Sequence, residues 1–189
     1  MIIALVGPSG AGKSLVENLL SKEFGYEKMI SYTTRKPRIG EVNGKDYHFI
    51  DNETFNETIE RGLFAEYEEY SQQRFYGTLK SDYETKTNKV VVLTPNGLRQ
   101  LKKNCNLGNI FTVMVTSNLG TRVKRYIDRC GVNEFNFDDA NEIFARINRD
   151  FGMFLGVPEE VELVVENNEG TDINDIVNQI IDYALLSVQ

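Results

Sequence analysis

The feature that most constrains this chain is an eight-residue loop near its start, GPSGAGKS at residues 7–14. The loop matches G-x-x-x-x-G-K-[ST] at every fixed position. The apolar run Ile2–Val6 precedes it and predicts a strand buried on both faces. Apolar residues at helical spacing then predict a helix from Lys13 to Phe24 that stops at Gly25. The loop therefore joins a buried strand to a helix, which is the context in which this pattern binds phosphate.

Each residue type in the loop has a physical role in binding a nucleoside triphosphate. Gly10 and Gly12 let the backbone curve so that successive N–H groups point at one anion, and the positive end of the following helix adds to their attraction. We expect Lys13 to reach the β and γ phosphates and the Ser14 hydroxyl to bind Mg²⁺. The predicted ATP and Mg²⁺ site comprises the whole loop: Gly7, Pro8, Ser9, Gly10, Ala11, Gly12, Lys13 and Ser14.

Strands and helices alternate along most of the remaining chain. Further strands are predicted at residues 89–94, 110–116 and 161–165, and further helices at residues 95–103, 119–129, 138–154 and 172–187. Strands separated by helices imply an α/β fold in which a doubly wound parallel sheet has helices on both faces.

Residues 31–78 have a different character, because aromatic residues and turn formers dominate and apolar runs are short. One helix is predicted there, at residues 52–61. We expect a small mixed α/β insertion whose strands are antiparallel. The predicted core then comprises residues 1–30 and 79–189, with a helical lid at about 120–154.

The overall charge bears on the class of partner that the chain can bind. The 189 residues include 21 Lys and Arg against 28 Asp and Glu, for a net charge of −7, which argues against nucleic acid as the main partner. No run of about 18 apolar residues is present, so we expect no membrane span. The N-terminus lacks the basic start and length of a secretory signal, and we expect a cytoplasmic protein. Cys105 and Cys130 are too few for a disulfide framework and lack metal-ligand spacing.

Two further segments carry a family resemblance. Residues 31–49 read SYTTRKPRIGEVNGKDYHF and residues 64–78 read FAEYEEYSQQRFYGT. With the phosphate loop they resemble the guanylate kinase family, whose pattern continues with S-x-T-T-R-x-P-R-x-G-E-x-x-G-x-D-Y-x-F, then F-x-E and Y-G-[ST]. The order is the family's, with a slightly longer spacing between Glu66 and Tyr76. The resemblance implies Mg²⁺-dependent phosphoryl transfer from ATP to a nucleoside monophosphate, with GMP or dGMP favoured.

An acceptor monophosphate brings a dianionic phosphate that needs cations. Arg35 and Arg38, on a loop stiffened by proline, can bind it through paired hydrogen bonds. The hydroxyls of Tyr47 and Tyr76 can donate uncharged hydrogen bonds. Glu41 is best used to orient an arginine.

The resemblance also implies where the acceptor base binds. Ser31, Glu66 and Thr78, with Gly77 beside them, are expected in the part of the site that faces the base. A carboxylate there can accept hydrogen bonds from the N1–H and the exocyclic amine that guanine presents together.

The chain departs from the family on the strand that follows the insertion. The family has D-I-D-x-Q-G there, and alignment on Gly97 puts Val92 and Thr94 at the two aspartate positions. The family's aspartates support the metal site and recognition of the acceptor base, whereas Thr94 can offer only an uncharged hydrogen bond and Val92 none. A kinase with altered base specificity, including for deoxynucleotides, is therefore the main alternative. A protein-binding domain of the same fold is less favoured, because such domains typically have damaged phosphate loops.

Cations around the transferring group supply most of the catalysis of phosphoryl transfer. By resemblance to the family's lid, we expect donor-phosphate contacts from Arg125, Arg129, Arg146 and Arg149, which pair on common helix faces. Near the end of the chain, VVENN resembles the family's strand beside the donor purine and implicates Asn167 or Asn168.

Overall fold

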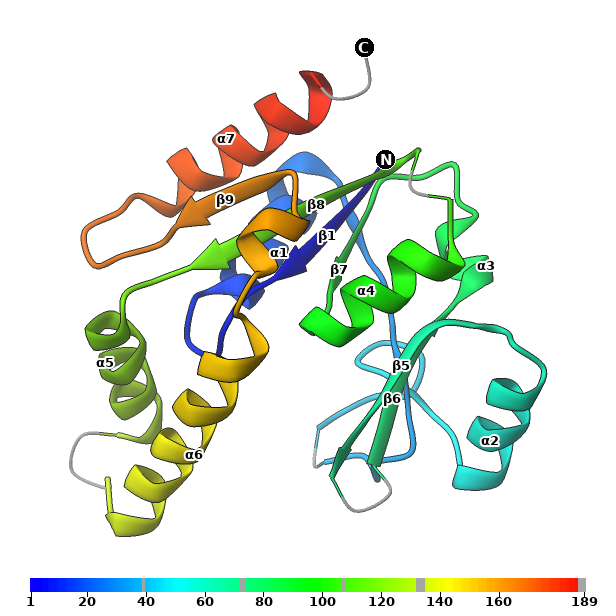
Figure 1. The fold of residues 1–189 in the computed structure, drawn as a ribbon, viewed down its shortest axis with the longest axis horizontal. Helices are drawn as coiled ribbons and strands as arrows, with labels where there is room; N and C mark the ends of the chain where they lie inside the picture. Colours follow the sequence, from blue (N-terminus) through cyan, green and yellow to red (C-terminus); the bar gives the residue numbers. More distant parts are fainter. Residues whose placement is uncertain (39, 72–73, 107, 132–134, 187–189) are drawn as a thin grey trace.

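The central sheet follows the strand and helix pattern of the sequence. The computed structural model describes residues 1–38, 40–71, 74–106, 108–131 and 135–186 (Figure 1). Its five-stranded parallel sheet has the order β2-β7-β1-β8-β9. These strands are β1 (Ile2–Val6), β2 (Glu27–Lys28), β7 (Lys89–Val92), β8 (Ile110–Thr116) and β9 (Leu163–Glu166).

Helices cover both faces of this sheet, because alternate side chains of β1 point to opposite layers. On one face, Ile3 and Leu5 share a core with the helices α1 (Lys13–Phe24) and α7 (Ile173–Leu186). On the other face, Ile2, Ala4 and Val6 share a core with α4 (Pro95–Asn104). The doubly wound α/β prediction is confirmed.

One strand end and two short elements differ from the prediction for identifiable reasons. β7 ends at Val92, before the predicted residue 94, because Thr94 is the N-cap of α4 and its hydroxyl accepts a hydrogen bond from the Gly97 N–H at 3.0 Å. β2 (Glu27–Lys28) and the one-turn helix α3 (Lys80–Tyr83) were not predicted, because both are too short to show an apolar period.

The insertion forms a second sheet of order β4-β3-β6-β5. Its strands are β3 (Tyr32–Thr33), β4 (His48–Phe49), β5 (Phe64–Ser71) and β6 (Arg74–Leu79). β6 runs antiparallel to both β5 and β3, as expected, but β3 and β4 are parallel, so that part of the prediction is wrong. The physical reason is the long loop between β3 and β4, which returns the chain to the end of the sheet where it started.

Helix α2 (Asn52–Glu60) closes the core of the insertion. Asp51 caps it by accepting a hydrogen bond from the Thr54 N–H at 2.7 Å. The fully buried ring of Phe55 lies 4.4 Å from Phe64 and 5.3 Å from Phe75 between ring centroids. The insertion therefore has an aromatic core of its own.

The helices α5 (Leu119–Cys130) and α6 (Phe137–Met153) form an arm on the other side of the molecule from the insertion (Figure 1). A 3₁₀ turn at Val157–Glu160 leads from the arm back to β9. Within the described ranges, no helix has both the length and the apolar character that crossing a bilayer requires.

Candidate functional site

The phosphate loop has no room for side chains at its glycines. Gly12 has a φ of 101°, in the left-handed region, and a Cβ built there would lie 2.2 Å from Asn167 Nδ2. At Gly7, with a φ of 155°, a Cβ would lie 2.0 Å from the carbonyl oxygen of Val115. Glycine is therefore required by both conformation and space.

Lys13 is folded back into the loop. Its ammonium donates hydrogen bonds to the carbonyl oxygens of Gly7 at 2.6 Å and Pro8 at 3.2 Å. Burial lowers its pKa to about 8, although the negative charge of Asp150 opposes this shift. A partly desolvated ammonium favours an arriving anion strongly, because little water has to be displaced from it.

The arm is pinned to the loop by a buried ion pair. Asp150 of α6 is only 4% exposed and accepts a hydrogen bond from the Ser9 N–H at 2.8 Å. Arg122 of α5 pairs with the same carboxylate and donates through Nε to the Ser9 carbonyl oxygen at 2.7 Å. Both backbone groups of Ser9 are thus held by side chains of the arm.

One cavity, of about 470 Å³, lies over the start of α1, and we call it the loop cavity. Arg125 lines it and donates to the carbonyl oxygens of Gly10 at 3.2 Å and Ala11 at 3.3 Å. Asn167, 2% exposed, accepts from Arg125 at 3.0 Å and donates to Ala11 at 2.9 Å.

Two more of the predicted arginines line the loop cavity. The guanidinium carbons of Arg129 and Arg146 each lie 5.5 Å from the centre of the Tyr126 ring, and Arg146 also pairs with Glu142. The structure therefore brings Lys13, Ser14, Arg125, Arg129, Arg146 and Asn167 together around one space. Asn168 is not among the lining residues, and its side chain accepts from the Asn118 N–H at 2.8 Å.

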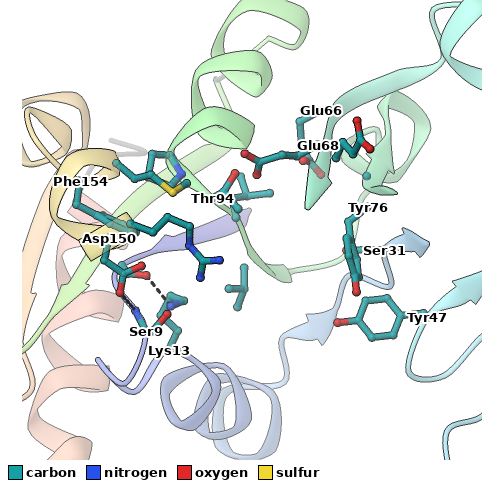
Figure 2. A pocket seen from close by; sticks show the side chains of 18 residues that line it. Ser9, Lys13, Ser31, Tyr47, Glu66, Glu68, Tyr76, Thr94, Asp150 and Phe154 are labelled. Carbon is teal, nitrogen blue, oxygen red and sulfur yellow. Dashed lines mark hydrogen bonds between the residues drawn. The ribbon is translucent and has the colours of Figure 1, made fainter. Parts of the chain in front are cut away.

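A second cavity, of about 410 Å³, lies between the insertion and the arm, and we call it the insertion cavity (Figure 2). From the insertion it is lined by Ser31, Tyr47, Glu66, Tyr76 and Gly77; from α6 by Arg149 and Asp150; and from the core by Gly7, Ser9, Lys13, Val92 and Thr94. In Figure 2, the rings of Tyr47 and Tyr76 lie across the cavity from Lys13 and Asp150. Ser9 and Lys13 line both cavities, so the two spaces meet at the phosphate loop.

The two predicted acceptor arginines have different surroundings. Arg35 forms a two-pronged pair with Glu41, with both N···O distances 2.8 Å, and lies 5.4 Å from the centre of the Tyr47 ring. Glu41 also accepts from the Arg38 N–H at 2.7 Å, and these hydrogen bonds lower its pKa to about 2. This is the geometry expected of a carboxylate that orients an arginine. Neither Arg35 nor Arg38 is among the lining residues of the insertion cavity, and the Arg38 side chain is exposed.

Glu66 lines the insertion cavity and is only 7% exposed, and this burial raises its pKa to about 7. The Thr78 hydroxyl donates to Glu66 Oε1 at 2.8 Å and lies 3.0 Å from the hydroxyl of Tyr83. Glu66 Oε2 lies against Gly97, where a Cβ would be only 2.9 Å away. The second carboxylate oxygen therefore depends on a glycine in the first turn of α4.

Comparison with known proteins decides the family. The family model described as guanylate kinase matches residues 1–184. The chain belongs to the guanylate kinase family. It is 38% identical over 109 residues to the guanylate kinase of Lactobacillus johnsonii, covering 54% of this chain and 53% of that protein. It is 37% identical over 134 residues to that of Clostridioides difficile, covering 68% and 64%. The chain thus spans about half the length of the first of these relatives.

Solved structures agree on the fold. The structure is similar to that of guanylate kinase from Anaplasma phagocytophilum, with a TM-score of 0.68 and 21% identity over 100% of this chain and 86% of that one. At this identity the likeness supports the guanylate kinase fold alone.

The sequence did not predict one part of this site, the ion pair of Arg122 and Asp150 that holds the phosphate loop. Arg122 was one of several cations on a predicted helix, and Asp150 one of many acids. The available signal was weak: Asp150 directly follows Arg149, and on that helix only Arg146 and Arg149 were assigned to the lid. Only the packing of α5 against α6 brings the two charges to Ser9.

Replacing only one partner of this pair should destabilise the protein more than replacing both. Arg122→Met leaves a buried carboxylate unpaired, which should cost about 3–5 kcal/mol in the free energy of unfolding, whereas Arg122→Met with Asp150→Leu should recover most of that loss. Urea unfolding measures both. Arg99→Met is the control, because its pair with Glu160 is exposed and should contribute no more than about 1 kcal/mol. If the double variant were no more stable than Arg122→Met, the pair would not be the source of the loss.

Proposed function

We propose that the protein transfers the γ-phosphoryl group of ATP to a nucleoside monophosphate, with GMP and dGMP as the favoured acceptors. The observation that carries the proposal is the meeting of two cavities at Lys13 and Ser9. A triphosphate in the loop cavity and a monophosphate in the insertion cavity would bring their phosphates to one ammonium. Such positioning supplies most of the rate of phosphoryl transfer.

The donor side combines a curved loop with fixed cations. The glycines leave an open cradle, Lys13 supplies a poorly hydrated positive charge, and Arg125, Arg129 and Arg146 surround the same space. Charge that spreads over the γ-phosphoryl oxygens is stabilised by these cations without reorganisation. Asn167, which holds both Arg125 and the loop, serves the donor side by fixing their relative position.

The loop also fits Mg²⁺. Ser14 lines the loop cavity beside Lys13 and offers a hydroxyl oxygen, the kind of ligand that Mg²⁺ prefers. Among the described residues there is no group of three or more His, Cys, Asp or Glu side chains that could hold a metal, so Ser14 would share the ion with the phosphates of the nucleotide. When bound, Mg²⁺ neutralises charge on the β and γ phosphates.

The acceptor side uses one ionic and two uncharged contacts. Arg35, oriented by Glu41, would bind the monophosphate with the hydroxyls of Tyr47 and Tyr76. Arg38 would join them only after its loop moves inward, because its side chain is exposed. Arg149 would approach the transferring group from the α6 side.

Glu66 and Ser31 would bind the base, with Gly77 at the wall of the cavity, and the buried Thr78 would hold Glu66 in place through its hydroxyl. An ionised Glu66 accepts from both N1–H and the 2-amino group of guanine.

A second acceptor class is favoured by one specific observation. Val92 and Thr94 both line the insertion cavity, at the positions where the family has aspartates. Thr94 uses its hydroxyl to cap α4, and Val92 offers no polar atom. Glu66 is then the main polar determinant of the base, and altered base specificity is the alternative. We further propose that the protein is cytoplasmic and that neither nucleic acid nor a membrane is its partner. In this proposal the chain divides into a core, an insertion and a lid.

A coupled assay with MgATP and a panel of ribo- and deoxynucleoside monophosphates tests the proposal. We expect the highest kcat/KM for GMP and dGMP. Faster turnover of another base would establish the alternative, and no turnover of any monophosphate would contradict both.

Lys13→Ala should lower kcat at least about 100-fold, because a contact that stabilises the transferring charge contributes about 3 kcal/mol or more. Lys22→Ala is the control, because it removes the same charge from an exposed position on α1. Thermal unfolding should show that both variants remain folded. A Lys13→Ala variant that kept more than about a tenth of the wild-type kcat would contradict the donor site.

The KM for GMP should depend on pH through Glu66. Its pKa is raised to about 7, so the carboxylate prevails above that pH and the neutral acid below it. Because guanine needs the carboxylate, KM should be flat above about pH 8 and rise about tenfold per unit below pH 6. Glu66→Gln should have a raised KM without this dependence, and it controls for ionisation of the GMP phosphate. An equal pH dependence in both proteins would exclude Glu66 as its source.

A further inference from the structure

Helix α6 has a row of large apolar side chains on its outer surface. Phe137, Phe144 and Phe151 are 79%, 64% and 84% exposed, and Leu155, just beyond the helix, is 79% exposed. The three phenylalanines are spaced by seven residues, or two helical turns, so they lie on one face. We call these four residues the α6 stripe.

The stripe points away from both cavities. Arg146 lines the loop cavity and Arg149 the insertion cavity, and both are on the opposite side of α6 by helical spacing. Asp150 reaches the phosphate loop, and Ile143 is buried toward α5. Movement of the arm toward the phosphate loop would therefore leave the stripe uncovered.

The residues that flank the stripe are small or uncharged. Asn141, Ala145, Asn148 and Gly152 lie beside the phenylalanines and are exposed. A partner that covers this face would bury apolar surface without desolvating a charged group. The centres of protein interfaces have this composition, apolar and poor in charged residues. Large exposed apolar patches on a protein surface commonly mark interaction sites.

The spacing of the stripe fits a second copy of the same chain. Phe137 and Phe151 are equally far from Phe144 along the helix. If two α6 helices pack antiparallel about a two-fold axis at Phe144, that ring meets its own copy and Phe137 meets the partner's Phe151. A two-fold interface must be self-complementary in this way.

Charge selects the antiparallel orientation. The first turn of α6 carries Asp138 and Asp139, whereas Arg146 and Arg149 face the two cavities on the opposite side of the helix. Antiparallel packing keeps the two acidic first turns apart and opposes the two helix dipoles. Parallel packing would bring the acidic ends together.

The exposed apolar area of the stripe is more than half of what one partner buries in a standard interface. Four side chains exposed to this extent supply roughly 500 Å² of apolar surface per copy, against about 800 Å² in total per partner for a standard interface. Polar residues of α6 at the edge of the stripe would supply the remainder. We propose that the protein forms a homodimer through antiparallel packing of the α6 stripes, which joins the arms of the two subunits.

Sedimentation velocity from about 1 to about 100 µM tests this proposal. We expect a wild-type dimer and at least a 100-fold weaker association of Phe144→Glu, because the substitution puts a charge at the two-fold axis. Tyr183→Glu is the control, because Tyr183 is an exposed aromatic residue on α7, outside the stripe. A wild-type monomer at the highest concentration, or a dimer that survives Phe144→Glu, would overturn the proposal.

Cross-linking tests the orientation and does not depend on the proposed activity. In a Cys105→Ser and Cys130→Ser background, a mixture of Phe137→Cys and Phe151→Cys should be joined by a short thiol-reactive linker. Phe137→Cys alone should not be joined. Efficient linking of Phe137→Cys to itself would overturn the antiparallel arrangement, and an unchanged thermal unfolding profile would show that the variants are folded.

Discussion

The rest of the site depends on the close packing of the phosphate loop. Its backbone curves in left-handed conformations at Gly10 and Gly12, and neighbouring atoms occupy the space that side chains would need. The loop can keep its amide groups available for an anion only if other parts of the protein hold it from outside. Asn167 from the end of β9, Arg125 from α5 and Asp150 from α6 provide these contacts. The loop is therefore held by contacts from both the sheet and the arm.

Charge distribution explains how an acidic protein can offer a phosphate site. The net charge is −7, yet the described cations near the two cavities are concentrated on α1, α5 and α6. One of them, Arg146, is paired with Glu142, and two cations outside the cavity linings are also neutralised within the protein, Arg122 by Asp150 and Arg35 by Glu41. Lys13 is different, because its hydrogen-bond partners are carbonyl oxygens and burial lowers its pKa. An incoming phosphate would therefore give Lys13 a negative partner that its carbonyl contacts do not supply.

Much of the fold could be predicted from local patterns. The β1 strand, the loop and α1 are fixed by neighbouring residues, and their bounds were predicted correctly. The parallel pairing of β3 with β4 could not be predicted, because it depends on the path of a loop that has no periodic pattern. Within the site, contacts between residues far apart in the sequence could not be predicted either. Glu41 was expected to orient an arginine, and it pairs with Arg35, whereas the ion pair that holds Ser9 joins residues of two different helices.

The central claim is that two phosphate sites share the ammonium of Lys13. Calorimetric titration with a bisubstrate analogue, in which adenosine and guanosine are joined by a polyphosphate, tests it most directly. The claim predicts that the analogue binds at least about 100-fold more tightly than ADP or GMP alone, because one molecule pays the cost of association once. It also predicts that Lys13→Ala loses most of this gain while Lys22→Ala keeps it. An analogue that bound no more tightly than ADP would contradict the claim, because the two cavities would then not act as one site.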